Sequence, residues 1–378
     1  MWDGLQALRE NRVLKRLELA DSYFSNSCAM VLAEVLRYNA LEEVLLFAKK
    51  ITDLGARALA KTLQESSTLK RLDLSKCELT SSVVPKFVEA VSRNHAVECV
   101  RLGDVDIPED WAPTLFLAED VYSRLQVSWN TRALEQWATS LQRQGFLFPR
   151  AYLRWTKYAD SSGIVHWFSA ARVNSASLVE LVIECPRAVD AKSSKAVASF
   201  LETTRSLKKL IVRPFQYDHM FSAAVLNSLA RNQSVCEAEF SQTLQAPSQA
   251  EALKTLLLTN RALHRLKFSH DSLPSEAPAK LARALEDNFV FLTLEFKYQH
   301  AENDMYPVLR ALIRNRSLLN RAVEYVLDGA RDEHSMRALR CLSTTESLLD
   351  AVSTASGKVR EECRWLVLEA VRSLECQQ

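Results

Sequence analysis

The chain repeats one pattern of apolar and polar positions along most of its length. Each unit opens with Leu-x-x-Leu-x-Leu or a close variant, continues through a polar turn, and closes with apolar residues four apart. Alternation predicts a short strand, and the four-residue spacing predicts a helix. Strand segments open at Leu14, Leu41, Leu69, Val97, Leu178, Leu207, Val235, Leu263 and Phe291. Because one such unit cannot bury its apolar face alone, the units must stack.

Three features of the pattern carry detailed expectations. On the strand of the second unit, Leu41, Val44 and Leu46 are expected to point into the core. Helix residues ten and six positions before the next opening share one helical face, which we expect to pack against the sheet. These pairs include Leu59/Leu63, Val197/Leu201, Val225/Leu229, Leu253/Leu257 and Leu281/Leu285. Asn stands three residues before an opening at Asn11, Asn94, Asn232, Asn260, Asn288 and, at the last unit, Asn315, where a left-handed helix end is expected.

The stretch 104–177 fits the pattern poorly, although its length is right for two further units. We expect one strand near Tyr122, Leu125 and Val127, a helix ending at Gly145, a strand in FPRAYLRW and a helix in IVHWFSAARVN. This stretch is rich in large aromatic residues: Trp129, Trp137, Phe146, Phe148, Tyr152, Trp155, Tyr158, Trp167 and Phe168. Two interpretations stay open, a core filled by large rings or a set of contact residues on the surface.

After Asn315 the repeat gives way to amphipathic helical patterns. We therefore predict a repeat domain over residues 1–315, with about eleven repeats, and a helical C-terminal cap over residues 316–378. At the other end, Leu5 and Leu8 resemble the second half of a repeat helix. Either Met1 begins a minimal cap, or the chain is a fragment of a longer protein.

The unit resembles the leucine-rich repeat of the ribonuclease-inhibitor type, which also occurs in NOD-like receptors and Ran GTPase-activating proteins. The resemblance covers roughly residues 5 to 315 and implies an α/β solenoid (horseshoe) with an inner parallel β-sheet and outer α-helices. The Asn or Cys that this family places three residues after the last strand Leu is matched here only by Cys77. The equivalent positions hold Ser22, Lys49, Val105, Pro186, Phe215, Thr243, Asp271 and Gln299, so irregular turns are expected.

The charge balance and the absence of known motifs argue against several classes of function. Lys plus Arg is 48 and Asp plus Glu is 46, a net charge of +2, which argues against binding to nucleic acid or an anionic membrane. No glycine-rich phosphate loop, no His-Glu-x-x-His motif and no Cys-x-x-Cys pair occurs, so we expect no cofactor, no metal and no catalysis. No stretch is apolar enough for a membrane helix. The eight dispersed cysteines favour reduced thiols and a cytoplasmic or nuclear location.

Residues between the inward strand positions are the candidate contact residues, because they project from the sheet. They change sign from strand to strand, and two interpretations follow. Neighbouring charges form a ladder of exposed ion pairs, or they form a mosaic that selects a protein partner. The partner-binding candidates are Leu45, Phe47, Arg71, Asp73, Arg101, Trp155, Glu180, Lys209, Arg213, Glu237, Glu239, Arg265 and Lys267.

The sequence thus predicts a non-catalytic protein-interaction scaffold that binds a protein partner on its concave face, like the repeat region of a NOD-like receptor. The alternative is a regulator of a small GTPase that resembles Ran GTPase-activating proteins. That family has a strongly acidic tail after its repeats, whereas this chain ends in VREECRWLVLEAVRSLECQQ, with mixed charge.

Overall fold

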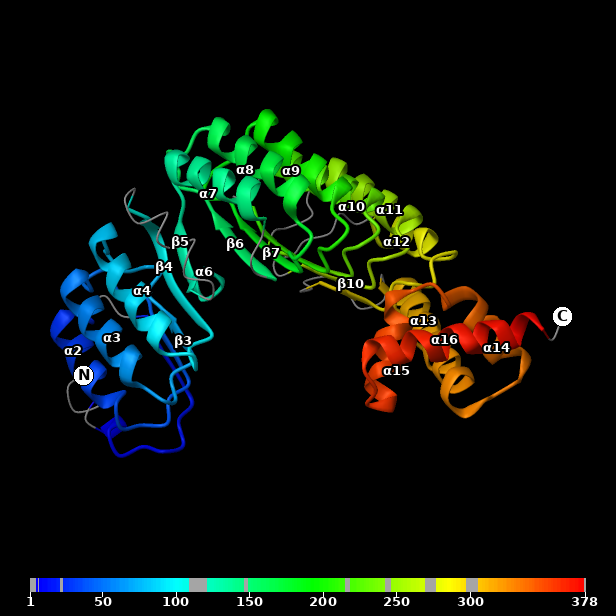
Figure 1. Ribbon diagram of the computed structural model, residues 1–378, viewed down its shortest axis with the longest axis horizontal. Coiled ribbons are helices and arrows are strands. Elements are labelled where there is room, and N and C mark those ends of the chain that lie inside the picture. Colours follow the sequence, from blue (N-terminus) through cyan, green and yellow to red (C-terminus); the bar gives the residue numbers. More distant parts are fainter. Residues whose placement is uncertain are drawn as a thin grey trace. The chain divides into compact units, whose positions relative to one another are not determined.

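The computed structural model describes residues 5, 7–20, 23–108, 121–145, 149–214, 218–241, 246–268, 277–296 and 305–376. The chain divides into two compact units, Met1–Pro186 and Arg187–Gln378. In both, parallel strands alternate with helices, as the predicted α/β repeat fold requires (Figure 1). The division falls inside the repeats and not at residue 315, so the predicted domain boundary stays a prediction.

The first unit follows the predicted order of elements. Its strands are β1 (Arg16–Leu19), β2 (Glu43–Leu46), β3 (Arg71–Asp73), β4 (Cys99–Asp106), β5 (Leu125–Ser128), β6 (Arg150–Arg154) and β7 (Glu180–Glu184). Its helices are α2 (Asn26–Val35), α3 (Asp53–Glu65), the 3₁₀ turn η1 (Ser81–Val83), α4 (Val84–Arg93), α6 (Val121–Arg124), α7 (Thr131–Gln144) and α8 (Ser161–Asn174). Strands β1 to β5 pair in parallel in chain order, and β6 pairs in parallel with β7. The two units expected within residues 104–177 are therefore present, as β5 with α7 and β6 with α8.

The second unit continues the alternation and ends in helices only. Strands β8 (Lys209–Arg213), β9 (Glu237–Phe240), β10 (Arg265–Phe268) and β11 (Thr293–Glu295) pair in parallel in chain order. They alternate with α9 (Ala191–Thr203), α10 (His219–Arg231), α11 (Pro247–Thr259) and α12 (Ala277–Ala284). The last elements are α13 (Tyr306–Asp328), α14 (Glu333–Leu342), α15 (Glu346–Ser356) and α16 (Arg360–Glu375).

The core of each unit lies between its strands and its helices, where the expected apolar residues are buried. Leu41, Val44 and Leu46 are at most 1% exposed. The predicted helix pairs are equally buried, from Leu59 and Leu63 to Leu281 and Leu285. Burying side chains of this size contributes about 1.5–3 kcal/mol each, so the apolar repeat supplies most of the stabilisation.

In three of the repeats the asparagine does not adopt the expected left-handed conformation. The helix-ending residues Asn94, Asn232 and Asn260 have φ of −111°, −76° and −76°, which is extended backbone. Their role lies in the side chain. Asn260 is 1% exposed; its Nδ2 donates to the carbonyls of Leu229 and Asn232, both at 2.7 Å, and its Oδ1 accepts from the backbone N–H groups of Ala262 and Leu263. One amide thus bonds four backbone groups of two adjacent repeats, of which the Leu229 carbonyl also accepts from the N–H of Asn232 at 3.1 Å.

The same arrangement recurs along the chain, and we call it the asparagine ladder. Each amide donates to two carbonyls of the preceding repeat: Asn94 to Leu63 and Ser66, Asn232 to Leu201 and Thr204, Asn288 to Leu257 and Asn260, and Asn315 to Asn288 and Phe291. In the irregular stretch an arginine takes this place. Arg124, 8% exposed, donates from Nη1 to the carbonyls of Asn94 and Val97 at 2.8 and 3.0 Å. The ladder therefore extends into the repeat whose sequence fits the pattern least.

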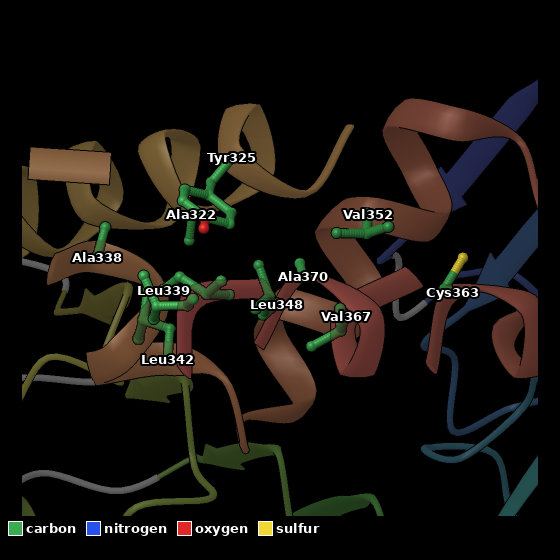
Figure 2. Close-up of a cluster of buried hydrophobic side chains, with 11 residues drawn as sticks. Ala322, Tyr325, Ala338, Leu339, Leu342, Leu348, Val352, Cys363, Val367 and Ala370 are labelled. Atoms are coloured by element: carbon green, nitrogen blue, oxygen red, sulfur yellow. The ribbon is translucent and has the colours of Figure 1, made fainter. Parts of the chain in front are cut away.

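The C-terminal helices form their own apolar core, shown in Figure 2. α14, α15 and α16 lie in the stretch after Asn315 where the sequence predicts amphipathic helices. α13 is continuous from Tyr306 to Asp328, so the helix of the last repeat and the first helix of the cap are one element. It ends at Gly329, whose φ of +72° is the left-handed geometry that glycine adopts without strain.

We expect Asn260→Ala to destabilise the protein by about 3 kcal/mol, because it removes four hydrogen bonds and leaves the Asn232 carbonyl and two N–H groups buried without the partner that Asn260 supplies. Urea unfolding followed by far-UV circular dichroism measures the change. Asn320→Ala is the matched control, since Asn320 is exposed on α13. Equal midpoints for the two variants would contradict a structural role of the ladder.

Candidate protein-binding surface

The outward strand residues of the first unit lie in rows that cross the sheet. In one row, parallel pairing aligns Arg16, Glu43 and Arg71 on adjacent strands. Arg16 Nη1 lies 3.3 Å from Glu43 Oε2, Arg71 Nη1 lies 3.0 Å from Glu43 Oε1, and Arg71 Nη2 lies 3.2 Å from Glu98 Oε2. Acid and base alternate, as the ladder interpretation predicts. The Arg71 side chain is still 58% exposed, so solvent screens these pairs and they add little to stability.

The next row combines apolar and charged residues. Leu45 on β2 is in register with Asp73 on β3, and Asp73 with Arg101 on β4. Arg101 Nη1 lies 3.4 Å from Asp73 Oδ2, and its Nε donates to Gln126 Oε1 at 2.7 Å. Phe47, just beyond β2, is half-buried, and the ammonium group of Lys76 lies 5.0 Å from its ring centre. This row therefore places the apolar residues Leu45 and Phe47 beside the hydrogen-bonded charges of Asp73 and Arg101.

A denser network, which the sequence analysis did not single out, surrounds Arg154 on β6. Its guanidinium forms ion pairs with Glu184 on β7 and Asp104 on β4, and its Nε donates to Ser128 Oγ at 3.1 Å. Tyr152 donates its hydroxyl to Glu184 Oε2 at 2.9 Å. The side chains of Arg154 and Glu184 are only 14% and 20% exposed, so this pair is shielded far better than the outer rows. The register of β6 on β7 could have revealed it, because Arg154 aligns with Glu184.

Asp104 reaches this network because β4 changes its register at a glycine. Gly103 has φ of +69°, and a Cβ atom there would lie 2.4 Å from the carbonyl oxygen of Ser75. The pairing of β4 with β5 shifts between Arg101 and Asp106. Only glycine fits such an approach of two backbones. Burial and the neighbouring charge of Asp104 raise the pKa of Asp106 above its ordinary value.

The second unit carries two rows of the same kind. Lys209, Glu237 and Arg265 are in register on β8, β9 and β10, and Ile211, Glu239 and Lys267 form the adjacent row. Arg265 Nη1 lies 3.7 Å from Glu237 Oε1, and Lys267 Nζ lies 3.7 Å from Glu239 Oε2. Arg213 is half-buried at the end of β8.

The structure shows whether Trp155 and the aromatic residues around it lie in the core or on the surface. Trp129, Trp137, Trp155, Trp167 and Phe168 are at most 1% exposed, and the rings of Trp129 and Trp137 stack at 4.3 Å between centroids. The prediction that Trp155 contacts a partner is therefore wrong for this conformation, since a buried indole offers no surface. The core interpretation is confirmed for these rings. Tyr158 is 79% exposed, and Phe146 and Phe148 lie outside the described residues.

The remaining predicted residue, Glu180, pairs with the base in register with it. Arg150 Nε on β6 lies 3.3 Å from Glu180 Oε2 on β7. Twelve of the thirteen predicted contact residues thus lie on strands or at strand ends with at least partly exposed side chains. They belong to two separate sets, one in each compact unit.

In the described part of the chain, no three His, Cys, Asp or Glu side chains lie close enough together to hold a metal ion. Among the described helices, none is long and apolar enough to cross a membrane. Cys77, at the capping position of its turn, donates Sγ–H to the carbonyl of Leu46 at 3.4 Å, and burial raises the pKa of its thiol to about 11. A protonated thiol is the form that this donation requires. Ser22, Phe215, Thr243, Asp271 and Gln299, the equivalent positions in other turns, lie outside the described residues.

No family model and no curated protein matches this chain. Its fold is similar to that of several solved structures, at low identity. One, described as "Leiomodin-1 Actin-Binding Site 2 (ABS2)", is 16% identical, with a TM-score of 0.36 over 43% of this chain and 95% of that one. The tropomodulin C-terminal domain of Caenorhabditis elegans is 16% identical, with a TM-score of 0.29 over 50% and 95% of the two chains.

A third structure, the complex of Rad7 and Elc1 in yeast, is 13% identical, with a TM-score of 0.30 over 80% of this chain and 86% of that one. Parallel strands and helices alternate in units of similar length, and this alternation defines a leucine-rich-repeat-like solenoid.

We expect Arg154→Ala to lower the free energy of unfolding by about 2 kcal/mol, because it leaves the shielded carboxylate of Glu184 without its cation. Arg71→Ala, in the exposed row, is expected to change it by less than about 0.5 kcal/mol. Chemical denaturation of both variants measures the difference. The interpretation fails if the two substitutions have the same effect.

The thiol of Cys77 should react slowly with a maleimide at pH 8, because a pKa of about 11 leaves about 0.1% of it as thiolate. Since folding raises this pKa, the reaction should accelerate as the pH rises towards 11. Peptide mass spectrometry after timed labelling resolves each cysteine, and the exposed Cys376 is the internal control. Equal labelling rates for Cys77 and Cys376 at pH 8 would contradict the burial argument.

Proposed function

We propose that this protein is a non-catalytic interaction scaffold whose strand surfaces bind a protein partner. The observation that supports the proposal most is the state of the outward charges. Each is oriented by a neighbour on the adjacent strand, yet Arg71, Glu98 and Arg265 keep 58%, 51% and 54% of their side-chain surface exposed. Charges held in place before binding lose less entropy when a partner docks, and their pattern selects the partner by complementarity.

Apolar residues on the same surfaces give such a partner something to bury. Leu45 and Phe47 in the first unit, and Val182 and Ile211 on β7 and β8, are half-buried at outward positions. Interface hot spots are typically a few apolar or aromatic residues surrounded by polar contacts. The predicted residues Leu45, Phe47, Arg71, Asp73 and Arg101 form one such group.

We further propose that the repeats are of the ribonuclease-inhibitor type and that the chain acts like the repeat region of a NOD-like receptor in the cytoplasm. The helices support this type, because α3, α9, α10 and α11 each have 13 residues, the full α-helix that this variant carries. The alternative, a regulator of a small GTPase, shares the same repeat. A GTP-turnover assay with Ran distinguishes them, and a rate increase on adding this protein would favour the alternative.

The binding surface is tested by comparing two double variants in quantitative affinity purification. Phe47→Ala with Arg71→Ala changes the strand side of the first unit, and Leu54→Ala with Arg57→Ala changes exposed residues of α3 in the same repeat. We expect partners of the native protein to be recovered at least about tenfold less with the strand variant and unchanged with the helix variant. If both variants retain the same partners, the strand surface of the first unit is not the binding site.

A further inference from the structure

Helix α16 has one buried face and, opposite to it, one exposed face. One face carries Cys363, Val367, Ala370 and Leu374, which are at most 8% exposed in the core of the C-terminal helices (Figure 2). The opposite face carries Glu361, Trp365, Leu368 and Arg372, all exposed, and we call these four residues the α16 stripe. Their spacing of four, three and four residues keeps them on one side of the helix.

The exposure of Trp365 sets it apart. Its side chain is 67% exposed and that of Leu368 is 49% exposed, whereas the four other tryptophans in the described residues are at most 1% exposed. Tryptophan is the residue most enriched at protein-binding hot spots, and burying one removes a large apolar area from water. The structure of a single chain gives no reason to leave this indole in solvent.

Two copies of the α16 stripe are complementary to each other when the helices run antiparallel. Glu361 and Arg372 lie 11 residues apart, which places them about 20° apart around the helix and about 8 Å on either side of its midpoint. A second copy of the helix in the antiparallel direction therefore brings Glu361 opposite Arg372 and Trp365 opposite Leu368. By two-fold symmetry each contact forms twice.

The end charges of the α16 stripe are available for this pairing. Within the described part of the chain, the side chains of Glu361 and Arg372 have no ion-pair or hydrogen-bond partner. The helix dipole favours an acid in the first turn and a base in the last, which explains the order of the two signs. It does not explain the exposed apolar pair between them.

We propose that the α16 stripe binds the α16 stripe of a second copy of this chain, antiparallel and about a two-fold axis. The apolar centre supplies the attraction, and the two Glu361–Arg372 contacts set direction and register. Since the stripe is short, the interface belongs to the small, transient class, with a dissociation constant on the order of 10–100 μM. This surface is distinct from the strand rows, and the proposal does not depend on them.

A charge-exchange experiment tests the proposal in the 378-residue chain. Glu361→Arg places two cations opposite each other in a homodimer, and Arg372→Glu places two anions opposite each other, so each variant alone should be monomeric at about 100 μM in sedimentation velocity. An equimolar mixture of the two should associate again, because every contact in the heterodimer joins opposite charges. Trp365→Ala should weaken association of the otherwise native protein at least about 30-fold.

Glu362→Arg is the matched control, because it reverses a charge in the same helical turn but outside the α16 stripe, and it should leave association unchanged. Far-UV circular dichroism verifies that each variant is folded. The proposal is overturned if the native protein stays monomeric up to about 1 mM, if Glu362→Arg abolishes association as the stripe variants do, or if mixing the two monomeric variants restores nothing.

Discussion

The fold depends on supplying hydrogen-bond donors to the carbonyl groups at the ends of its helices. Stacking buries those carbonyls between repeats, where water cannot reach them and where each unpaired group costs about 1–3 kcal/mol. The asparagine ladder meets this requirement from the neighbouring repeat and not from the same helix. The side-chain amide donates two hydrogen bonds to the preceding repeat, and its oxygen accepts from the backbone that follows the asparagine. The backbone at the end of each helix therefore depends on the stacking of adjacent repeats.

The strands and helices could be predicted because their apolar residues recur at two distinct periods. The strand at Leu41 to Leu46 and the helix pair Leu59 and Leu63 were correctly placed on that basis. The conformation of the asparagines was predicted wrongly. Asn tolerates the left-handed region, and this local preference was weighed without the partner that the next repeat supplies. A long-range contact overrode a local tendency, and only coordinates reveal the carbonyls involved.

The surface residues on regular strands could be predicted from the periodic pattern, whereas some of those in the irregular repeats could not. Outward positions on regular strands, such as Arg71 and Asp73, follow from alternation, and their acid–base neighbours follow from a constant repeat length. In the Arg154 network, the pair with Glu184 follows from the register of β6 on β7. The contact with Asp104 could not be predicted, because Asp104 reaches Arg154 only through the register change at Gly103. The prediction for Trp155 was wrong for a related reason. Alternation alone does not show which residues of an irregular repeat, rich in large aromatic side chains, point into the core.

The arginine at position 124 shows how such a chain can drift in sequence without losing its architecture. The carbonyls between repeats accept from any cationic or amide nitrogen that arrives at the right place, and the long guanidinium arm of Arg124 reaches it from a different point in the unit. A repeat can thus exchange its signature residue, and even its length by a few positions, while the hydrogen bonding is preserved. The acceptors are backbone atoms, which no substitution removes, whereas the side chain that donates to them differs between repeats of this chain.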